Sequence, residues 1–254
     1  QRQMCIRDRV RVVDADSVAA ILENGRGRAE YCDLAVLDFA SFVNPGGGYI
    51  RGAWAQEEAL CSESFLYNVL ESQRDWYGEN RRRNINCELY RNRGLVVPKV
   101  RFARDKIHAY ADVLVIAAPN ARRAREEYGV KEGVLERAMR ERIRFALDVV
   151  DMLGHKKVVL GAWGCGVFGW DADTVAELFR EELARGTHAI ELAIFAVSRD
   201  RFNENLQHFE HVFAAFPEKN AVSYAEAAAE RAAAAAEAEA QEEDEGEDDW
   251  RKYL

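Results

Sequence analysis

Short runs of apolar residues recur along the chain and predict buried β-strands. Nearly every residue is apolar in the runs at residues 34–40, 113–118, 157–160 and 190–197. Strands with both faces covered have this pattern, because the side chains of both faces then lie inside the protein. Weaker runs predict further short strands at residues 10–13, 88–90 and 96–102.

Apolar residues spaced three and four positions apart predict helices between these strands. The expected helices cover residues 14–23, 56–72, 131–153 and 203–216, with a further one from Asp171 or Asp173 to Ala184. Residues 75–86 are polar and rich in arginine, so we expect a connecting segment there. Strands that alternate with helices indicate an α/β fold, with a parallel or mixed sheet and helices on both faces.

The two ends of the chain differ from this core. Residues 1–9 fit no element, and we interpret them as a non-native or disordered segment. Residues 225–240 are nearly all Ala and Glu, which favours a helix without an apolar face. The acidic block at 241–249 is expected to be disordered. We therefore divide the chain into residues 1–9, a core at 10–217 and a tail at 218–254.

Charge is distributed unevenly between the core and the tail. The formal net charge of the 254 residues is −9, and residues 221–254 alone hold 11 acidic and 3 basic residues, a net of −8. The first 220 residues are therefore nearly neutral, at −1, and would not repel a polyanionic substrate. We expect no sequence-specific nucleic-acid binding. The basic run Arg81-Arg82-Arg83 indicates either a solvated surface or contact with phosphate.

The cysteines, the histidines and the hydropathy indicate which disulfides, metal sites, membrane spans and cellular compartment to expect. Five cysteines, an odd number without CxxC spacing, argue against a disulfide framework and a structural zinc site. This usage predicts a reducing, intracellular compartment, either the cytoplasm or a nucleus. The five histidines are scattered, so we expect no metal site. No run of 18 apolar residues exists, so no membrane span is expected.

Two glycine-rich loops follow predicted strands and are the strongest candidates for a binding site. In the first, Asn44-Pro45 precedes Gly46, Gly47 and Gly48, and Gln56-Glu57-Glu58 then opens a helix. Acidic residues at a helix start are favoured by the helix dipole, which is a purely structural explanation. However, open α/β sheets bind ligands at the carboxyl ends of their strands, where this pair lies. We therefore favour a functional interpretation.

The second loop follows the strand at 157–160 and contains Gly164, Gly166, Val167 and Phe168. Glycine-rich loops with free backbone N–H groups hold phosphates. No hydrophobic periodicity requires the Phe168 ring, so we expect it to contact a ligand, whereas Trp163 is expected to pack against the sheet. At the end of the strand at 113–118, Asn120 is another candidate contact, although Asn is also common in turns.

A pair of carboxylates suits the cleavage of a glycosidic bond. That reaction requires a proton for the leaving oxygen and a base for the attacking water. Consecutive residues on a helix point about 100° apart. Glu57 and Glu58 therefore cannot have the same role.

These motifs resemble those of a known family. The Gly46-Gly47-Gly48 triplet followed by Gln56-Glu57-Glu58 resembles the GGG…QEE signature of the poly(ADP-ribose) glycohydrolases. Asn44-Pro45 and residues 60–67 are similar to the microbial-type branch, and residues 160–169 are similar to the family's phosphate loop. The resemblance covers about residues 10–216. It implies a three-layer, macrodomain-like fold with a mixed, largely parallel sheet.

The resemblance also implies an activity and roles for individual residues. Glu58 would be the catalytic acid/base and Glu57 would hold a ribose hydroxyl, while Asn44 and Gln56 would position the ribose and the loop. The enzyme would trim poly(ADP-ribose) from its free end and release ADP-ribose, without a cofactor or metal. Its substrate would be the polymer or an ADP-ribosylated protein, and we expect a monomer.

Some alternatives and departures accompany this resemblance. The same cleft could bind ADP-ribose without hydrolysing it, or could hydrolyse another ADP-ribose conjugate. Asp38 and Trp170 replace residues expected from the family pattern, and we predict that neither contacts the catalytic pair. Microbial-type relatives have a further helical region before the core, so we expect this chain to be a fragment.

Overall fold

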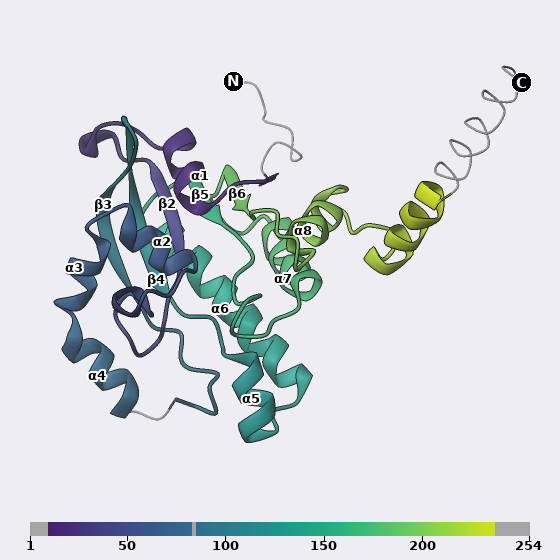
Figure 1. Ribbon diagram of the computed structural model, residues 1–254, viewed down its shortest axis with the longest axis horizontal. Helices are drawn as coiled ribbons and strands as arrows, with labels where there is room; N and C mark the ends of the chain where they lie inside the picture. Colours follow the sequence, from purple (N-terminus) through teal and green to yellow (C-terminus); the bar gives the residue numbers. More distant parts are fainter. Residues whose placement is uncertain (1–9, 83–84, 237–254) are drawn as a thin grey trace, which may run out of the picture.

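The computed structural model describes residues 10–82 and 85–236, and its strands form one mixed sheet (Figure 1). The strands are β1 (Val10–Val13), β2 (Leu34–Phe39), β3 (Gly94–Arg104), β4 (Ile107–Ile116), β5 (Lys157–Leu160) and β6 (Leu192–Ala196). Their order is β1-β6-β5-β2-β4-β3. Neighbouring strands are parallel except for the antiparallel pair β3 and β4. The predicted mixed, largely parallel sheet is confirmed.

Helices cover both faces of this sheet, which gives the predicted three layers. The α-helices are α1 (Ser17–Asn24), α2 (Gln56–Ser62), α3 (Leu66–Glu71), α4 (Arg74–Arg82), α5 (Ala121–Tyr128), α6 (Glu132–Met152), α7 (Ala172–Ala184) and α8 (Asn205–Phe213). Two short 3-10 helices are η2 (Ala29–Tyr31) and η3 (Tyr49–Arg51). In one apolar cluster, the helices α5, α6, α7 and α8 pack against one face of the sheet. In a second cluster, α1, α2 and α3 pack against its other face.

The hairpin of β3 and β4 is longer than the sequence predicted, and residues 88–90 do not form a strand. Glu88 and Tyr90 have φ angles of 65° and 60°, in the left-handed region. Their side chains explain this local conformation. The Tyr90 hydroxyl donates to Glu88 at 2.9 Å, and the Tyr90 ring stacks on Phe42 at 4.5 Å. Residues 88–90 therefore form an irregular segment held by Tyr90, and they do not pair with a β-strand.

The predicted single helix over residues 56–72 is two helices, and this prediction was wrong about its continuity. The break lies at Ser64, whose hydroxyl donates to the Leu60 carbonyl at 2.6 Å and accepts the Leu66 N–H at 3.1 Å. Nearby, Glu63 accepts two hydrogen bonds from Arg104 of β3, at 2.6 and 2.7 Å. These contacts lie between the end of α2 and the start of α3.

Helix α4 occupies a segment where the sequence predicted only a polar connection. It has one buried side, formed by Tyr77 and Asn80, although most of its residues are polar. The Asn80 amide donates to the Phe42 carbonyl at 2.7 Å. Helix α5 was not predicted either, because only two small residues, Ala121 and Ala124, bury its inner face. Helices with so few apolar residues have a weak periodic signal.

The chain beyond the core forms a helix over residues 224–236, which projects away from the body (Figure 1). Its first residue, Tyr224, lies against His208 of α8, with ring centroids 3.7 Å apart. The predicted Ala/Glu-rich helix is thus confirmed as far as residue 236. Residues 1–9, 237–240 and the acidic block lie outside the described residues. Within the described chain, no helix has the length and apolar character needed to cross a membrane.

Candidate active site

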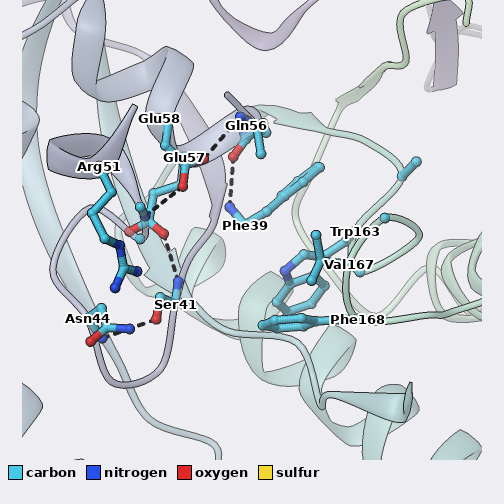
Figure 2. Close-up of a pocket in the computed structure, with 16 residues that line it drawn as sticks. Phe39, Ser41, Asn44, Arg51, Gln56, Glu57, Glu58, Trp163, Val167 and Phe168 are labelled. Carbon is cyan, nitrogen blue, oxygen red and sulfur yellow. Dashed lines mark hydrogen bonds between the residues drawn. The ribbon is translucent and has the colours of Figure 1, made fainter. Parts of the chain in front are cut away.

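Both glycine-rich loops lie at the same edge of the sheet. They follow β2 and β5, which are neighbouring parallel strands, so the loops start side by side. Together they line a cavity of about 380 Å³ (Figure 2). Of the residues predicted from sequence, the cavity is lined by Asn44, Gly47, Gly48, Gln56, Glu57, Glu58, Gly164, Gly166, Val167 and Phe168. The two motifs, more than 100 residues apart in sequence, form one site.

The Gln56 side chain fixes the start of α2 against the end of β2. Its carbonyl oxygen accepts the Phe39 N–H at 2.8 Å. Its amide group donates to the Leu37 carbonyl at 2.9 Å and to the Ser17 hydroxyl at 3.0 Å. The role of Gln56 in this structure is therefore to position the helix that carries the two glutamates.

Backbone N–H groups on either side hold the Glu58 carboxylate. Gly48 donates to Oε1 at 2.8 Å, and Ala55 donates to Oε2 at 3.1 Å. Ala55 is the N-cap of α2, so the second bond is the reciprocal half of a capping box. Each carboxylate oxygen has a second lone pair. Glu58 is thus fixed in orientation and can still accept or deliver a proton in the cavity.

Glu57 is held differently from Glu58. Its Oε2 accepts the Ser41 N–H at 2.8 Å, whereas its buried Oε1 has no hydrogen-bond partner among the described residues. Burial raises the pKa of Glu57 well above its usual range, and the nearby charge of Asp38 raises it further. Burial thus makes the charged form of Glu57 costly, and its buried Oε1 is left without a partner in the described chain.

The glycine triplet turns the backbone around both carboxylates. Gly46 and Gly47 have φ angles of 63° and 60°, which L-residues with a Cβ rarely adopt. A Cβ on Gly47 would lie 2.6 Å from Oε1 of Glu58 and 2.8 Å from Oε2 of Glu57. Gly46 does not line the cavity itself, but its conformation brings Gly47 and Gly48 there. Glycine is therefore needed at Gly46 and Gly47 for their positive φ angles, and at Gly47 also because the two carboxylates leave no room for a side chain.

Asp38 interacts with the glutamate pair through charge and not through a hydrogen bond. It lies on β2 and is fully buried, and neither of its carboxyl oxygens has a hydrogen-bond partner within the described chain. Burial raises the pKa of Asp38 well above its usual range, and the charge of Glu58 adds to the effect. We predicted that Asp38 would not contact the catalytic pair; no hydrogen bond joins them in the described structure, but their charges interact. The sequence could not reveal this charge interaction, because Asp38 and the glutamates come close only when α2 packs against β2 in the fold.

The second loop presents a ring at the other side of the cavity. Phe168 is partly buried and lines the cavity, and its carbonyl accepts the Arg122 N–H at 2.9 Å. Trp163 is fully buried in the core, as predicted, although it also forms part of the cavity wall. Trp170 supports the loop from below, since its indole N–H donates to the Pro119 carbonyl at 2.7 Å. Figure 2 shows Val167 and Phe168 facing the glutamates across the cavity.

Asn120 does not belong to the residues that line this cavity. It is the N-cap of α5, where its side chain accepts the Arg123 N–H at 3.1 Å. Of the two explanations that the sequence left open, the structure therefore displays the local, turn-forming one. Asn44, in contrast, lines the cavity and accepts a hydrogen bond from Arg81 of α4.

Sequence reasoning missed several residues of the cavity, among them Phe39, Ser41 and Arg51. Ser41 contributes a backbone N–H, which no side-chain motif can reveal. Arg51 could have been found, because it is the basic residue between the glycine triplet and Gln56. Among the residues with described positions, no group of three or more His, Cys, Asp or Glu side chains could hold a metal ion.

This geometry can support acid/base chemistry on a phosphorylated sugar. Two carboxyl groups with different hydrogen-bond environments lie on one side of the cavity. Glycine-rich backbone and an aromatic ring lie on the other side (Figure 2). Backbone N–H groups in such loops bind phosphate, and a ring can lie against a ribose or a base.

Comparisons with known proteins agree with this geometry. A family model described as the catalytic domain of microbial-type PARG matches residues 2–105. Poly(ADP-ribose) glycohydrolase from Deinococcus radiodurans, solved in complex with ADP-ribose, is 33% identical, with a TM-score of 0.70. The match covers 79% of this chain and 82% of that protein.

A second similar structure comes from Thermomonospora curvata. It is a poly(ADP-ribose) glycohydrolase bound to the inhibitor ADP-HPD, and it is 33% identical with a TM-score of 0.68. The match covers 79% of this chain and 76% of that one. A comparison with curated protein sequences gives no match.

Proposed function

We propose that this chain, which belongs to the poly(ADP-ribose) glycohydrolase family, cleaves the polymer by acid/base catalysis at Glu58. The family follows from the match to the Deinococcus radiodurans enzyme, at 33% identity over 82% of that protein. The chain is therefore a glycosidase that hydrolyses the ribose–ribose bonds of poly(ADP-ribose). The observation that carries the assignment of the site is the common cavity of Glu57, Glu58 and the glycine-rich second loop.

In the proposed reaction, Glu58 delivers a proton to the oxygen that leaves with the neighbouring ribose. The bond between this oxygen and the anomeric carbon breaks, and the carbon develops oxocarbenium character. Water then attacks the anomeric carbon and returns its proton to Glu58. The bonds from Gly48 and Ala55 support this role, because they hold the carboxylate in one orientation. A fixed orientation lowers the entropy cost of reaching the transition state.

Glu57 has a positioning role in this proposal. Its Oε1 is buried without a partner in the described chain, which supports a hydrogen bond with a ribose hydroxyl that enters the cavity. The ring of Phe168 and the glycine-rich backbone at Gly164 and Gly166 would hold the diphosphate and its ribose. Asn44 lies at the other end of the cavity and would contact the distal ribose. In this arrangement, Asn120 makes no direct contact with the ADP-ribose unit.

The remaining features of the proposal concern the setting of the reaction. Residues 10–217 would form the catalytic domain, and the enzyme would act as a monomer from the free end of the polymer and release ADP-ribose. The four cysteines in the described chain are all free. Free cysteines support a reducing compartment as the place of action.

The proposal is tested with labelled poly(ADP-ribose), the wild type and the Glu58→Gln variant, without added metal. We expect the wild type to release ADP-ribose and Glu58→Gln to lose at least about a hundredfold in kcat, the size typical of a general acid/base group. Calorimetry with ADP-ribose should give similar Kd values for the two proteins. Equal turnover would remove Glu58 from the reaction, and binding without turnover by the wild type would indicate a reader of ADP-ribose.

A further inference from the structure

The guanidinium of Arg51 is a cation in the cavity wall and has no counter-ion among the described residues. Arg51 lies in η3, lines the cavity and is exposed. Within residues 10–82 and 85–236, its side chain has neither an ion pair nor a hydrogen bond. Its backbone N–H donates to the Gly48 carbonyl at 2.9 Å. This cation is therefore available to an anionic ligand.

Arg51 and the second loop lie on opposite sides of the two glutamates. Figure 2 shows its guanidinium beyond Glu57, on the side away from Val167 and Phe168. If the terminal ADP-ribose unit places its diphosphate against the second loop and its distal ribose at Glu58, Arg51 lies beyond the bond that is cleaved. What leaves across that bond is the rest of the polymer.

The loop that contains Arg51 also exposes a large aromatic residue. Trp54 is 80% exposed, and its ring has no aromatic or cation–π partner in the described structure. It directly precedes Ala55, which lines the cavity. An exposed indole beside a ligand cavity is a suitable surface for stacking, because every nucleobase presents a π-face. The packing of the protein itself does not account for the position of Trp54.

A second arginine reaches the same side of the cavity. Arg81 extends from α4 and donates to the side-chain oxygen of Asn44, which lines the cavity. Arg51 and Asn44, the contact of Arg81, thus lie at the end of the cavity opposite to Phe168, and the exposed Trp54 follows Arg51 by three residues in the same loop. Arginine suits phosphate recognition because its planar guanidinium presents several fixed donors. A cation combined with a free aromatic ring matches the chemistry of a nucleoside diphosphate.

We propose that Arg51, Trp54 and Arg81 form a subsite for the penultimate ADP-ribose unit, the leaving group of the reaction. Trp54 stacks on the adenine of that unit, and the two arginines contact its phosphates. The subsite rests on the proposed function, since it takes the glutamates as the point of cleavage. With this subsite the enzyme would prefer the polymer to a single ADP-ribose unit attached to a protein or a small molecule. Only the polymer carries a nucleotide on both sides of the glycosidic bond that is cleaved.

Two substrates distinguish a defect in this subsite from a defect in the catalytic centre. One is poly(ADP-ribose), and the other is ADP-ribose linked through its terminal ribose to a small phenol, which has no second nucleotide. The readout is the ratio of kcat/KM for the polymer to kcat/KM for the phenol conjugate. We expect Arg51→Ala and Trp54→Ala each to lower this ratio by about tenfold, the lower range of a stacking or charged contact.

Matched controls come from exposed residues of the same kind elsewhere. Arg11, on β1 at the end of the sheet, and Phe202, which is 81% exposed, are replaced by alanine and should leave the ratio unchanged. An unchanged ratio in both Arg51→Ala and Trp54→Ala, or an equal loss on both substrates, would overturn the subsite. If the wild type hydrolyses neither substrate, the proposed function itself fails, which is a distinct result.

Discussion

Gly47 faces Glu58 so closely that a Cβ built on the glycine would lie 2.6 Å from Oε1 of the glutamate. The same Cβ would lie 2.8 Å from Oε2 of Glu57. The glycine loop and the glutamate pair are therefore one steric unit. A side chain at Gly47 would displace these carboxylates.

The first prediction is that Gly47→Ala disables the enzyme. The methyl group must push at least one carboxylate out of place, so we expect kcat to fall by about a hundredfold, as when a catalytic acid/base group is lost. Kinetics with poly(ADP-ribose) would measure this. Gly52→Ala is the matched control: Gly52 also has a positive φ, of 75°, but nothing lies within 4 Å of its Cβ position. Equal activity of the two variants would contradict the steric explanation.

The second prediction concerns Asp38 and pH. Burial, followed by the charge of Glu58, raises the pKa of Asp38 in the folded protein. The folded state therefore binds this proton more tightly than the unfolded state, where the pKa is about 3.9. The stability contributed by the bound proton is fully present below about pH 3.9 and is lost as the pH rises towards the folded pKa. The neutral amide of an Asp38→Asn variant does not titrate in this range, so its stability lacks this contribution.

We therefore expect the Tm of Asp38→Asn, relative to the wild type, to increase steadily from pH 4 to pH 7. Thermal unfolding over this range would measure the difference. Asp33→Asn provides a control of opposite sign. Burial raises the pKa of Asp33, but its hydrogen bonds with Lys157 and Arg26 outweigh burial and lower the pKa overall. Loss of Asp33 should therefore cost more stability at pH 7 than at pH 3. A Tm difference for Asp38→Asn that is independent of pH would argue against a buried, protonated Asp38.

The third prediction is that Phe168→Ala weakens ADP-ribose binding. An aromatic ring stacked against a base or ribose contributes about 1–3 kcal/mol, so the Kd should rise by about tenfold or more. Isothermal titration calorimetry would measure it. Phe202→Ala removes an exposed ring outside the cavity and should leave the Kd unchanged. If both variants bind ADP-ribose equally well, Phe168 has only a packing role, through contacts such as that with Tyr90.

The fourth prediction is that Asn120 matters for stability more than for binding. Removing its side chain in Asn120→Ala deletes the cap of α5, which costs about 1 kcal/mol. Asn120→Asp keeps an acceptor at the positive end of the helix and should retain the stability of the wild type. Urea unfolding and ADP-ribose calorimetry together separate the two roles. A large loss of affinity in Asn120→Asp, with stability retained, would show that the amide contacts the ligand.

Much of the fold and of the site was determined by local features of the sequence. Buried parallel strands are apolar at nearly every position, so β2 and β5 were predicted almost to the residue. The two glycine-rich loops were predicted as binding loops because they directly follow these strands. Residues whose role depends on backbone conformation, such as Gly47, can be identified in this way, since few other residues adopt a positive φ.

The tertiary structure alone decided the features that depend on contacts between distant segments. Arg104 of β3 bonds Glu63 at the end of α2, next to the break at Ser64. Asp38 affects the glutamate pair because β2 lies beneath α2. Arg51 becomes part of a cavity because β2 and β5 pair side by side. Periodicity and spacing report neighbours along the chain, whereas burial and charge interactions act through space, so only the folded structure defines them.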